Sequence, residues 1–154
     1  MAEAPFVIDG LNLAYWCGAP PTLRVPLAAW SALLSRGATA RLVFDASTPY
    51  QLPEAEQAVY AQMLADAPQQ VLQVPGGESA DGHLLALAKS SGGAILSRDR
   101  FREYRRGWRV VRRRRYAGVV AQDQLLLREL ELQAPLEASA HAAWLALRAR
   151  LQED

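Results

Sequence analysis

Short apolar runs alternate along this chain with longer segments in which apolar residues recur every three or four positions. The short runs end at turn residues or acidic residues and have the length of buried strands. They predict strands at 5–9, 40–44, 71–74, 94–96 and Trp108–Val111. The longer segments predict helices at 27–35, 53–67, 79–91, 122–132 and 135–152, with a short helix from Asp99.

This alternation of strands and helices is typical of an α/β fold with a mainly parallel central sheet. Each strand–helix–strand connection should be right-handed, which places helices on both faces of the sheet in a three-layer arrangement. The length of 154 residues fits one domain. We therefore expect a single domain over 1–154 that ends in a C-terminal helix at about 135–152.

The composition narrows the class of protein. Hydrophobic residues make up 51% of the chain, which is enough for a core, but no run approaches the roughly 20 apolar residues of a membrane span. No basic segment followed by an apolar run marks a signal peptide. The single cysteine, Cys17, excludes an internal disulfide and a cysteine-based zinc site. We expect a cytoplasmic location and no membrane partner.

Positive charge is concentrated in one segment, although the net charge of the chain is only +1. Ten of the 17 basic residues are arginines between Arg98 and Arg115, interleaved with aromatic residues. Such a cluster favours RNA as the partner, because guanidinium groups contact phosphates and aromatic rings stack on unpaired bases. The alternative is a solvated basic segment, or pairing with acids of the C-terminal half. The candidate RNA-binding residues are Arg98, Arg100, Arg102, Arg105, Arg106, Arg112, Arg113, Arg114 and Arg115.

Acidic residues follow four successive predicted strands. Asp9 ends the first strand, Asp45 ends the second, Asp81 lies in the first turn of the helix after the third, and Asp99 follows the fourth. Ligands of parallel α/β sheets bind beyond the carboxyl ends of the strands, so we expect these acids at one edge. A single aspartate at such a position is often only a turn or cap residue. Four in succession are far less expected from turns alone.

Carboxylates gathered at one edge repel each other and need a cation when they are ionised together. Hard oxygen ligands suit Mg²⁺ or Mn²⁺, and such a metal can activate water for attack on a phosphate. Glu103 lies four residues after Asp99, on the same face of the predicted short helix. Asn12 follows Asp9 closely; it is either a turn residue or an amide that orients a carboxylate or touches the scissile phosphate.

Three segments resemble the NYN branch of the PIN-like nuclease superfamily, and most closely its Regnase-type ribonuclease domain. They are V-I-D-G-L-N at Val7–Asn12, A-D-G-H-L-L-A-L-A at Ala80–Ala88 and I-L-S-R-D-R-F-R-E-Y at Ile95–Tyr104. The resemblance extends in order over roughly 6–105. It implies a PIN-like, Rossmann-like fold and a metal-dependent ribonuclease.

The resemblance also implies roles for individual residues. It places the family's metal-site acids on Asp9, Asp81 and Asp99, its last aspartate on Glu103, and its asparagine on Asn12. Glutamate keeps the charge of the family's aspartate but lengthens the side chain. Other departures are leucine at position 11 and arginine at position 98, where the family has serine and asparagine.

We therefore expect an endoribonuclease that acts on single-stranded or looped RNA with Mg²⁺ or Mn²⁺. The expected catalytic residues are Asp9, Asn12, Asp81 and Asp99, and the expected metal ligands are Asp9, Asp81, Asp99 and Glu103. Asp45 is a weaker candidate. Two alternatives stay open: a non-catalytic RNA-binding module of the same fold, and a DNA-directed nuclease. The apolar stripe of the last predicted helix packs either inward or against a second copy in a homodimer.

Overall fold

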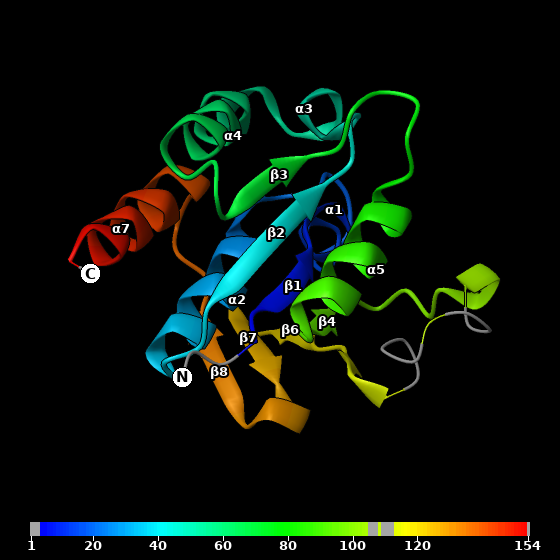
Figure 1. Ribbon diagram of the computed structural model, residues 1–154. Coiled ribbons are helices and arrows are strands. Elements are labelled where there is room, and N and C mark those ends of the chain that lie inside the picture. The colour runs from blue at the N-terminus through cyan, green and yellow to red at the C-terminus, as the bar shows by residue number, and fades with distance from the viewer. Residues whose placement is uncertain (1–3, 105–107, 109–112, 154) are drawn as a thin grey trace.

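A sheet of five parallel strands in the order β3-β2-β1-β4-β5 forms the centre of the computed structural model, which describes residues 4–104, 108 and 113–153 (Figure 1). The strands are β1 (Phe6–Asp9), β2 (Ala40–Phe44), β3 (Val71–Gln73), β4 (Ala94–Leu96) and β5 (Arg115–Tyr116). Helices lie on both faces of this sheet. The predicted α/β fold, with a mainly parallel sheet between helical layers, is confirmed.

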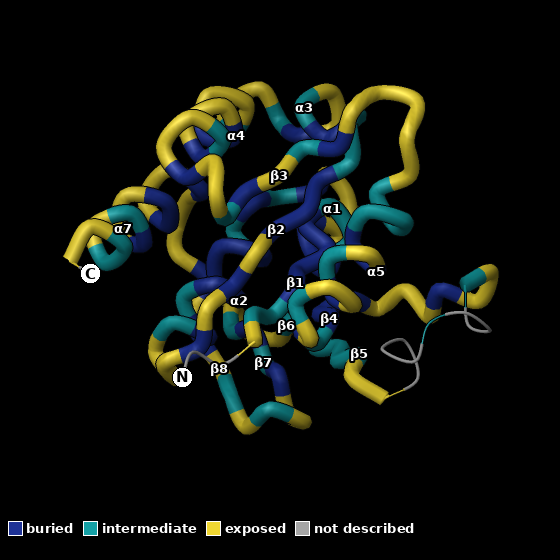
Figure 2. Tube along the Cα trace, viewed as in Figure 1, coloured by how far each residue is buried: buried dark blue, intermediate teal, exposed yellow. Residues whose placement is uncertain are grey.

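The two faces of the sheet carry separate apolar clusters because side chains alternate along a strand. Ile8 and Phe44 belong to the larger cluster, together with side chains from α2, α4 and α7. Val7 and Val43, one position away, belong to the smaller cluster with α5. Figure 2 shows the central strands as the most buried part of the chain. The α-helices are α1 (Gly10–Ala14), α2 (Arg24–Ser35), α3 (Thr48–Gln51), α4 (Glu54–Asp66), α5 (Ala80–Ser91) and α7 (Ala140–Gln152).

The order of the strands creates a switch point between β1 and β4. From β1 the chain adds β2 and then β3 on one side, whereas β4 pairs with β1 on the opposite side. Connections leave β1 and β4 in opposite directions, which opens a crevice at the carboxyl ends of these two strands. Asp9 is the last residue of β1, and Ser97–Asp99 directly follow β4.

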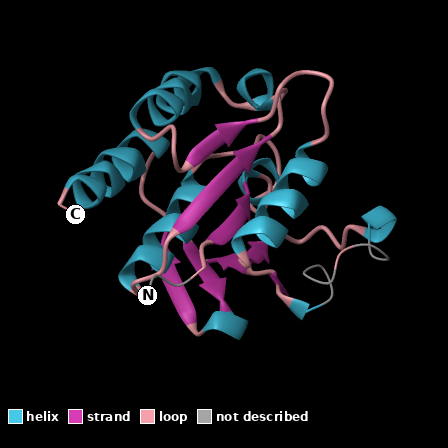
Figure 3. Cartoon of the chain, in the orientation of Figure 1, coloured by secondary structure: helices cyan, strands magenta, loops and turns pink. Residues whose placement is uncertain are grey.

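The predicted helix over 122–132 is wrong, because this segment belongs to a second, antiparallel sheet (Figure 3). Its strands are β6 (Val119–Ala121), β7 (Gln124–Leu127) and β8 (Leu132–Pro135), with the short 3-10 helix η2 (Arg128–Leu130) before β8. Gln122 and Asp123 both have positive φ and form a two-residue hairpin turn. Leu125 and Leu127 are buried between more exposed neighbours, which is strand periodicity. The helix propensity of leucine and glutamate is overridden by this pairing.

Three other boundaries also differ from the prediction. No α-helix forms from Asp99: its carboxylate accepts a hydrogen bond from the N–H of Phe101, whose φ is positive, and only the 3-10 turn η1 (Arg102–Tyr104) follows. The predicted strand Trp108–Val111 lies mostly outside the described residues, and the fifth strand is Arg115–Tyr116. The last helix begins at Ala140 because Pro135 ends β8 and Ser139 caps the helix.

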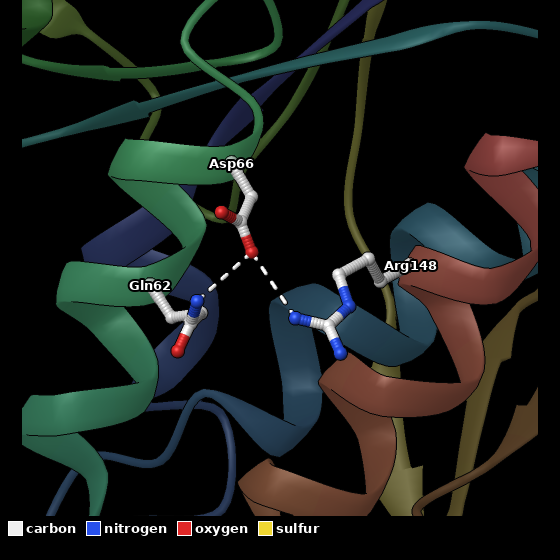
Figure 4. A network of polar contacts seen from close by, with 3 residues as sticks. All are labelled: Gln62, Asp66 and Arg148. Carbon is white, nitrogen blue, oxygen red and sulfur yellow. Dashed lines mark hydrogen bonds and ion pairs between the residues drawn. The ribbon is translucent and has the colours of Figure 1, made fainter.

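The C-terminal helix α7 packs inward. Trp144 is buried beside Trp30 of α2, with ring centroids 6.0 Å apart. Arg148 binds Asp66 of α4 at 3.2 Å, and Gln62 donates to the same carboxylate (Figure 4). The apolar stripe of this helix therefore contributes to the core of its own chain. Within the described part of the chain, no helix has the length and apolar character needed to cross a membrane.

Candidate active site

The four aspartates that follow the strands line one cavity of about 420 Å³ at the carboxyl edge of the sheet. Asp9 comes from the end of β1, Asp45 from the end of β2, Asp81 from the first turn of α5, and Asp99 from the segment after β4. Tyr15 and Gln51 complete one wall, so we call this space the tyrosine cavity. The shared edge expected from the sequence brings all four acids together.

A second cavity of about 500 Å³ adjoins the first and shares Asp81 and Asp99 with it. Glu103 lines this second cavity, together with three of the predicted RNA-binding arginines. We call it the arginine cavity. Its lining residues are Asp81, Arg98, Asp99, Arg100, Phe101, Arg102, Glu103 and Tyr104.

Asp9 is the most deeply placed acid of the site, with only 8% of its surface exposed. The hydroxyl of Ser97 donates to Oδ2 of Asp9 at 2.8 Å and accepts the backbone N–H of Asp99 at 3.0 Å. The carboxylate of Asp99 in turn accepts the N–H of Phe101. One buried serine thus links the ends of β1 and β4 and fixes Asp9 relative to Asp99.

The pKa of Asp9 is raised from 3.8 to about 7, and burial is the largest cause. The hydrogen bond from Ser97 lowers this pKa, the negative charges of Asp81 and Asp99 raise it, and the hydrogen bond from the backbone of Asn12 lowers it. Burial also raises the pKa of Asp81, and the charges of Asp99, Glu103 and Asp45 add to this effect. Charge repulsion among the acids of the two cavities therefore contributes to the raised pKa values of Asp9 and Asp81.

Asn12 holds the segment after β4 in place. Its Oδ1 accepts the backbone N–H of Arg98 and the indole N–H of Trp16, each at 2.9 Å. The guanidinium carbon of Arg98 lies 4.6 Å from the centre of a Trp16 ring, and its Nε donates to the carbonyl of Gly118. Asn12 lines the tyrosine cavity, and its side-chain oxygen positions the backbone next to Asp99.

Asp45 is both a turn residue and an acid of the site, the two interpretations that the sequence left open. Its Oδ2 accepts the N–H and the hydroxyl of Ser47, which is the local turn expected of an aspartate after a strand. These hydrogen bonds lower the pKa of Asp45. The residue nevertheless lines the tyrosine cavity with Asp9 and Asp81. It adds negative charge there while its own geometry is fixed by Ser47.

The arginines divide between the cavity and the scaffold. Arg100 and Arg102 are exposed and line the arginine cavity. Arg115 donates to the carbonyl of Ser97 at 3.0 Å, and Arg114 donates to the carbonyl of Gly92, so both hold backbone next to β4. Arg113 is exposed. The predicted RNA-binding residues Arg105, Arg106 and Arg112 lie outside the described residues.

Glycine is required immediately after Asp9. A Cβ on Gly10 would lie 2.4 Å from the ring of Phe44, which packs over the first turn of α1. This close approach explains why glycine, which has no Cβ, follows Asp9. The end of β1 is pressed against β2, and the carboxylate of Asp9 is directed into the crevice between buried elements.

Sequence reasoning missed two parts of this site. Ser97 is completely buried between the two strand ends, and the signal for it was its place in the segment Ile95–Tyr104, two residues before Asp99. The wall formed by Tyr15 and Gln51 joins residues 36 positions apart, with the hydroxyl of Tyr15 donating to Gln51 Oε1 at 2.6 Å. No local pattern predicts such a pairing.

The chemistry of the acids suits a cation. In the part of the chain that the structure describes, the only ion pairs are those of His83 with Glu78 and of Arg148 with Asp66, so no described basic side chain forms an ion pair with an acid of the site. Across 4–104, 108 and 113–153, no three His, Cys, Asp or Glu side chains already form a group that could hold a metal ion. The assignment of Asp9, Asp81, Asp99 and Glu103 to one metal shell stays a prediction.

Comparison with known proteins bears on the fold. No protein-family model and no curated protein matches the chain. The crystal structure of nuclear proteinaceous RNase P 2 from A. thaliana matches with a TM-score of 0.65 and 12% identity, over 88% of this chain. A structure of Arabidopsis thaliana nuclear protein-only RNase P 2 matches with a TM-score of 0.62 and 12% identity, over 90%. The chain spans 31% of each neighbour. The likeness shows that the chain shares the α/β fold of a part of these proteins.

Proposed function

We propose that this chain is an endoribonuclease that hydrolyses phosphodiester bonds of single-stranded or looped RNA with Mg²⁺ or Mn²⁺. The observation that carries the proposal is the burial of Asp9 at the switch point, among three further aspartates and with no basic partner in the described residues. Keeping such a group ionised costs stability, and functional sites are where such costs are found. The structural neighbours are ribonucleases by name, which agrees with the proposal.

The acids of the site would hold the cation. Asp9, Asp81 and Asp99 line the tyrosine cavity, and Glu103 adjoins them across the shared acids. A bound Mg²⁺ or Mn²⁺ would supply a Lewis acid that activates water and offsets negative charge on the scissile phosphate. Ser97 and Asn12 would act as positioning residues, because one holds Asp9 and the other holds the backbone of Arg98.

The arginine cavity would bind the phosphate chain of the substrate. Arg100 and Arg102 line it together with Asp99, one of the acids of the proposed reaction centre. Arginine offers planar pairs of donors that match phosphate oxygens. Donors placed at the scissile phosphate also stabilise the charge that develops in the transition state. Arg100 and Arg102 should therefore affect turnover as well as affinity.

A labelled-RNA cleavage assay with Mn²⁺, with Mg²⁺ and with EDTA tests the proposal. The parent should cleave with either metal and stop in EDTA, and Asp9→Asn should be inactive while keeping its fold by circular dichroism. Asp123→Asn is the matched control, since Asp123 is an exposed turn residue with positive φ, where asparagine is tolerated. RNA binding without cleavage under all conditions would indicate a binding module, and cleavage of DNA alone would indicate a DNA-directed nuclease.

A further inference from the structure

The two adjoining cavities differ in the groups that they offer to a ligand. The arginine cavity has three arginines beside its acids. The described residues that line the tyrosine cavity include four aspartates and no arginine or lysine. Its other polar groups are neutral side chains of Asn12, Tyr15, Ser47 and Gln51. Beyond the acids that would hold the cation, the described lining of the tyrosine cavity offers no basic side chain to a phosphate but several neutral polar groups to a base.

A chain of hydrogen bonds organises the neutral wall. The hydroxyl of Tyr15 donates to Oε1 of Gln51 at 2.6 Å, and Nε2 of Gln51 donates to the hydroxyl of Ser47 at 2.7 Å. Ser47 donates to Asp45 at 2.5 Å, which ties the wall to the end of β2. These contacts orient the Gln51 amide among the residues that line the cavity. Polar groups that are oriented before a ligand binds favour recognition of a defined chemical group.

The wall keeps free hydrogen-bonding capacity after these contacts are made. The Gln51 amide has a second N–H and a second oxygen lone pair, and the Tyr15 hydroxyl oxygen can still accept. Donor and acceptor side by side match the edge of a nucleobase. Tyr15 is 39% exposed, so its ring also offers a surface for an unpaired base. The volume of about 420 Å³ is within the range of small-molecule sites.

We infer that the tyrosine cavity binds an unpaired nucleobase next to the scissile phosphate, with Tyr15 as its stacking platform and Gln51 reading its edge. The inference rests on the proposed ribonuclease function and names the form of its substrate. The phosphate chain crosses the shared acids Asp81 and Asp99 and continues over the arginine cavity. A paired base could not enter, because its edge and faces are occupied in a duplex. This arrangement accounts for selection of single-stranded RNA.

Binding measurements in EDTA test the inference without any need for cleavage. The two probes are a labelled single-stranded oligouridylate and a ribose-phosphate chain of equal length that lacks bases. The parent should prefer the oligouridylate, and Tyr15→Ala should bind it about tenfold more weakly, as expected when one base no longer stacks on an aromatic ring. Its affinity for the abasic chain should not change. Gln51→Ala should bind oligouridylate and oligocytidylate with more similar affinities than the parent does.

Two controls protect the interpretation. Tyr15→Phe keeps the ring and should retain most of the preference for bases, which guards against a loss caused by misfolding. Tyr50→Ala removes a tyrosine that is 87% exposed on the same short helix as Gln51 but does not line the cavity, and it should bind like the parent. Equal weakening of both probes by Tyr15→Ala, or no weakening of either, would overturn the inference.

The two proposals can fail separately. If the parent never cleaves RNA but Tyr15→Ala still loses the preference for bases, the nuclease proposal falls and the base-binding cavity stands. If the parent cleaves RNA with Mg²⁺ and Tyr15→Ala keeps the full preference for bases, the base-binding cavity falls and the nuclease stands. The second result would move base recognition to another surface of the chain.

Discussion

The arginine cavity and the tyrosine cavity share two aspartates and differ in nearly everything else. The first is formed by the segment after β4, where arginines alternate with acidic and aromatic residues. The second is formed mainly by the ends of β1 and β2 and by residues of α1, α3 and α5 or next to them, and its described lining includes neutral polar side chains and no arginine. A polar, charged polymer such as RNA also has these two parts, a phosphate chain and a base. Under the two proposals above, one acidic edge serves both parts because its two sides are built from different elements.

The shared acids give the largest expected effect. Asp99→Asn removes one charge from both cavities, so cleavage should fall by about a hundredfold to a thousandfold, as for loss of a group that stabilises transition-state charge. RNA affinity in EDTA should not decrease, because the variant repels phosphate less. Single-turnover cleavage and binding measured on the same preparation check both points. Cleavage within a fewfold of the parent would show that the shared edge is not the reaction centre.

The buried acid of the tyrosine cavity should control the dependence of stability on pH. Since the pKa of Asp9 is raised from 3.8 to about 7, its protonated form favours the fold. That contribution is complete below about pH 3.8 and is lost as the pH rises through about 7. In metal-free buffer at pH 8, Asp9→Asn should be more stable than the parent by roughly 2–4 kcal/mol, and the gain should vanish toward pH 4.

Denaturant unfolding across this pH range in EDTA measures the effect. The control is Asp123→Asn, which alters an exposed aspartate outside both cavities and should unfold like the parent across this range. Added Mg²⁺ at pH 8 should stabilise the parent and not Asp9→Asn, because only the parent keeps the full set of acids. Parallel pH curves for parent and Asp9→Asn would contradict the assignment of the buried charge.

The arginine cavity should account for the dependence of RNA affinity on salt concentration. Arg100→Ala with Arg102→Ala should lower RNA affinity about tenfold at low salt and reduce the salt slope by about 0.7 for each phosphate that the variant no longer neutralises. Gln51→Ala should leave the slope unchanged. Arg148→Ala serves as the control, because Arg148 pairs with Asp66 on the outer helices. A combined change of Arg112–Arg115 is a poorer test, since Arg114 and Arg115 bind backbone carbonyls of the scaffold. An unchanged slope in the double variant would assign phosphate binding elsewhere.

Removing the Ser97 hydroxyl, which links the ends of β1 and β4, should have the smallest effect on cleavage. Ser97→Ala removes the donor that lowers the pKa of Asp9, so that pKa should rise further. The Mn²⁺ concentration needed for half-maximal cleavage at pH 7 should increase about threefold, as for loss of one hydrogen bond, and recover toward the parent value at pH 8.5. Ser97→Thr should restore the parent behaviour. A defect that is independent of pH would indicate that Ser97 acts only through packing.

The sequence allowed the four core strands and the acidic edge to be predicted, because these depend on local signals. Apolar runs that end in acids marked β1 and β2, and the alternation of strands with helices placed Asp9 and Asp81 on one side. The segment after β4 could not be predicted in the same way. Leucines in 124–127 suit a helix or a strand, and only pairing with β6 and β8 decides between them. The Ser97 bridge likewise exists only after β1 and β4 pair.

The loop 75–79 between β3 and α5 is exposed along its whole length. It divides the proposed site in two, because Asp9 and Asp45 precede it and Asp81 and Asp99 follow it. A fragment that ends before this loop carries Asp9 and Asp45 but lacks Asp81 and Asp99, the two acids that the cavities share. Chain breaks are best tolerated in exposed loops. Two separately expressed fragments that join here should therefore be inert alone and active when combined, which would make the protein a split reporter of association.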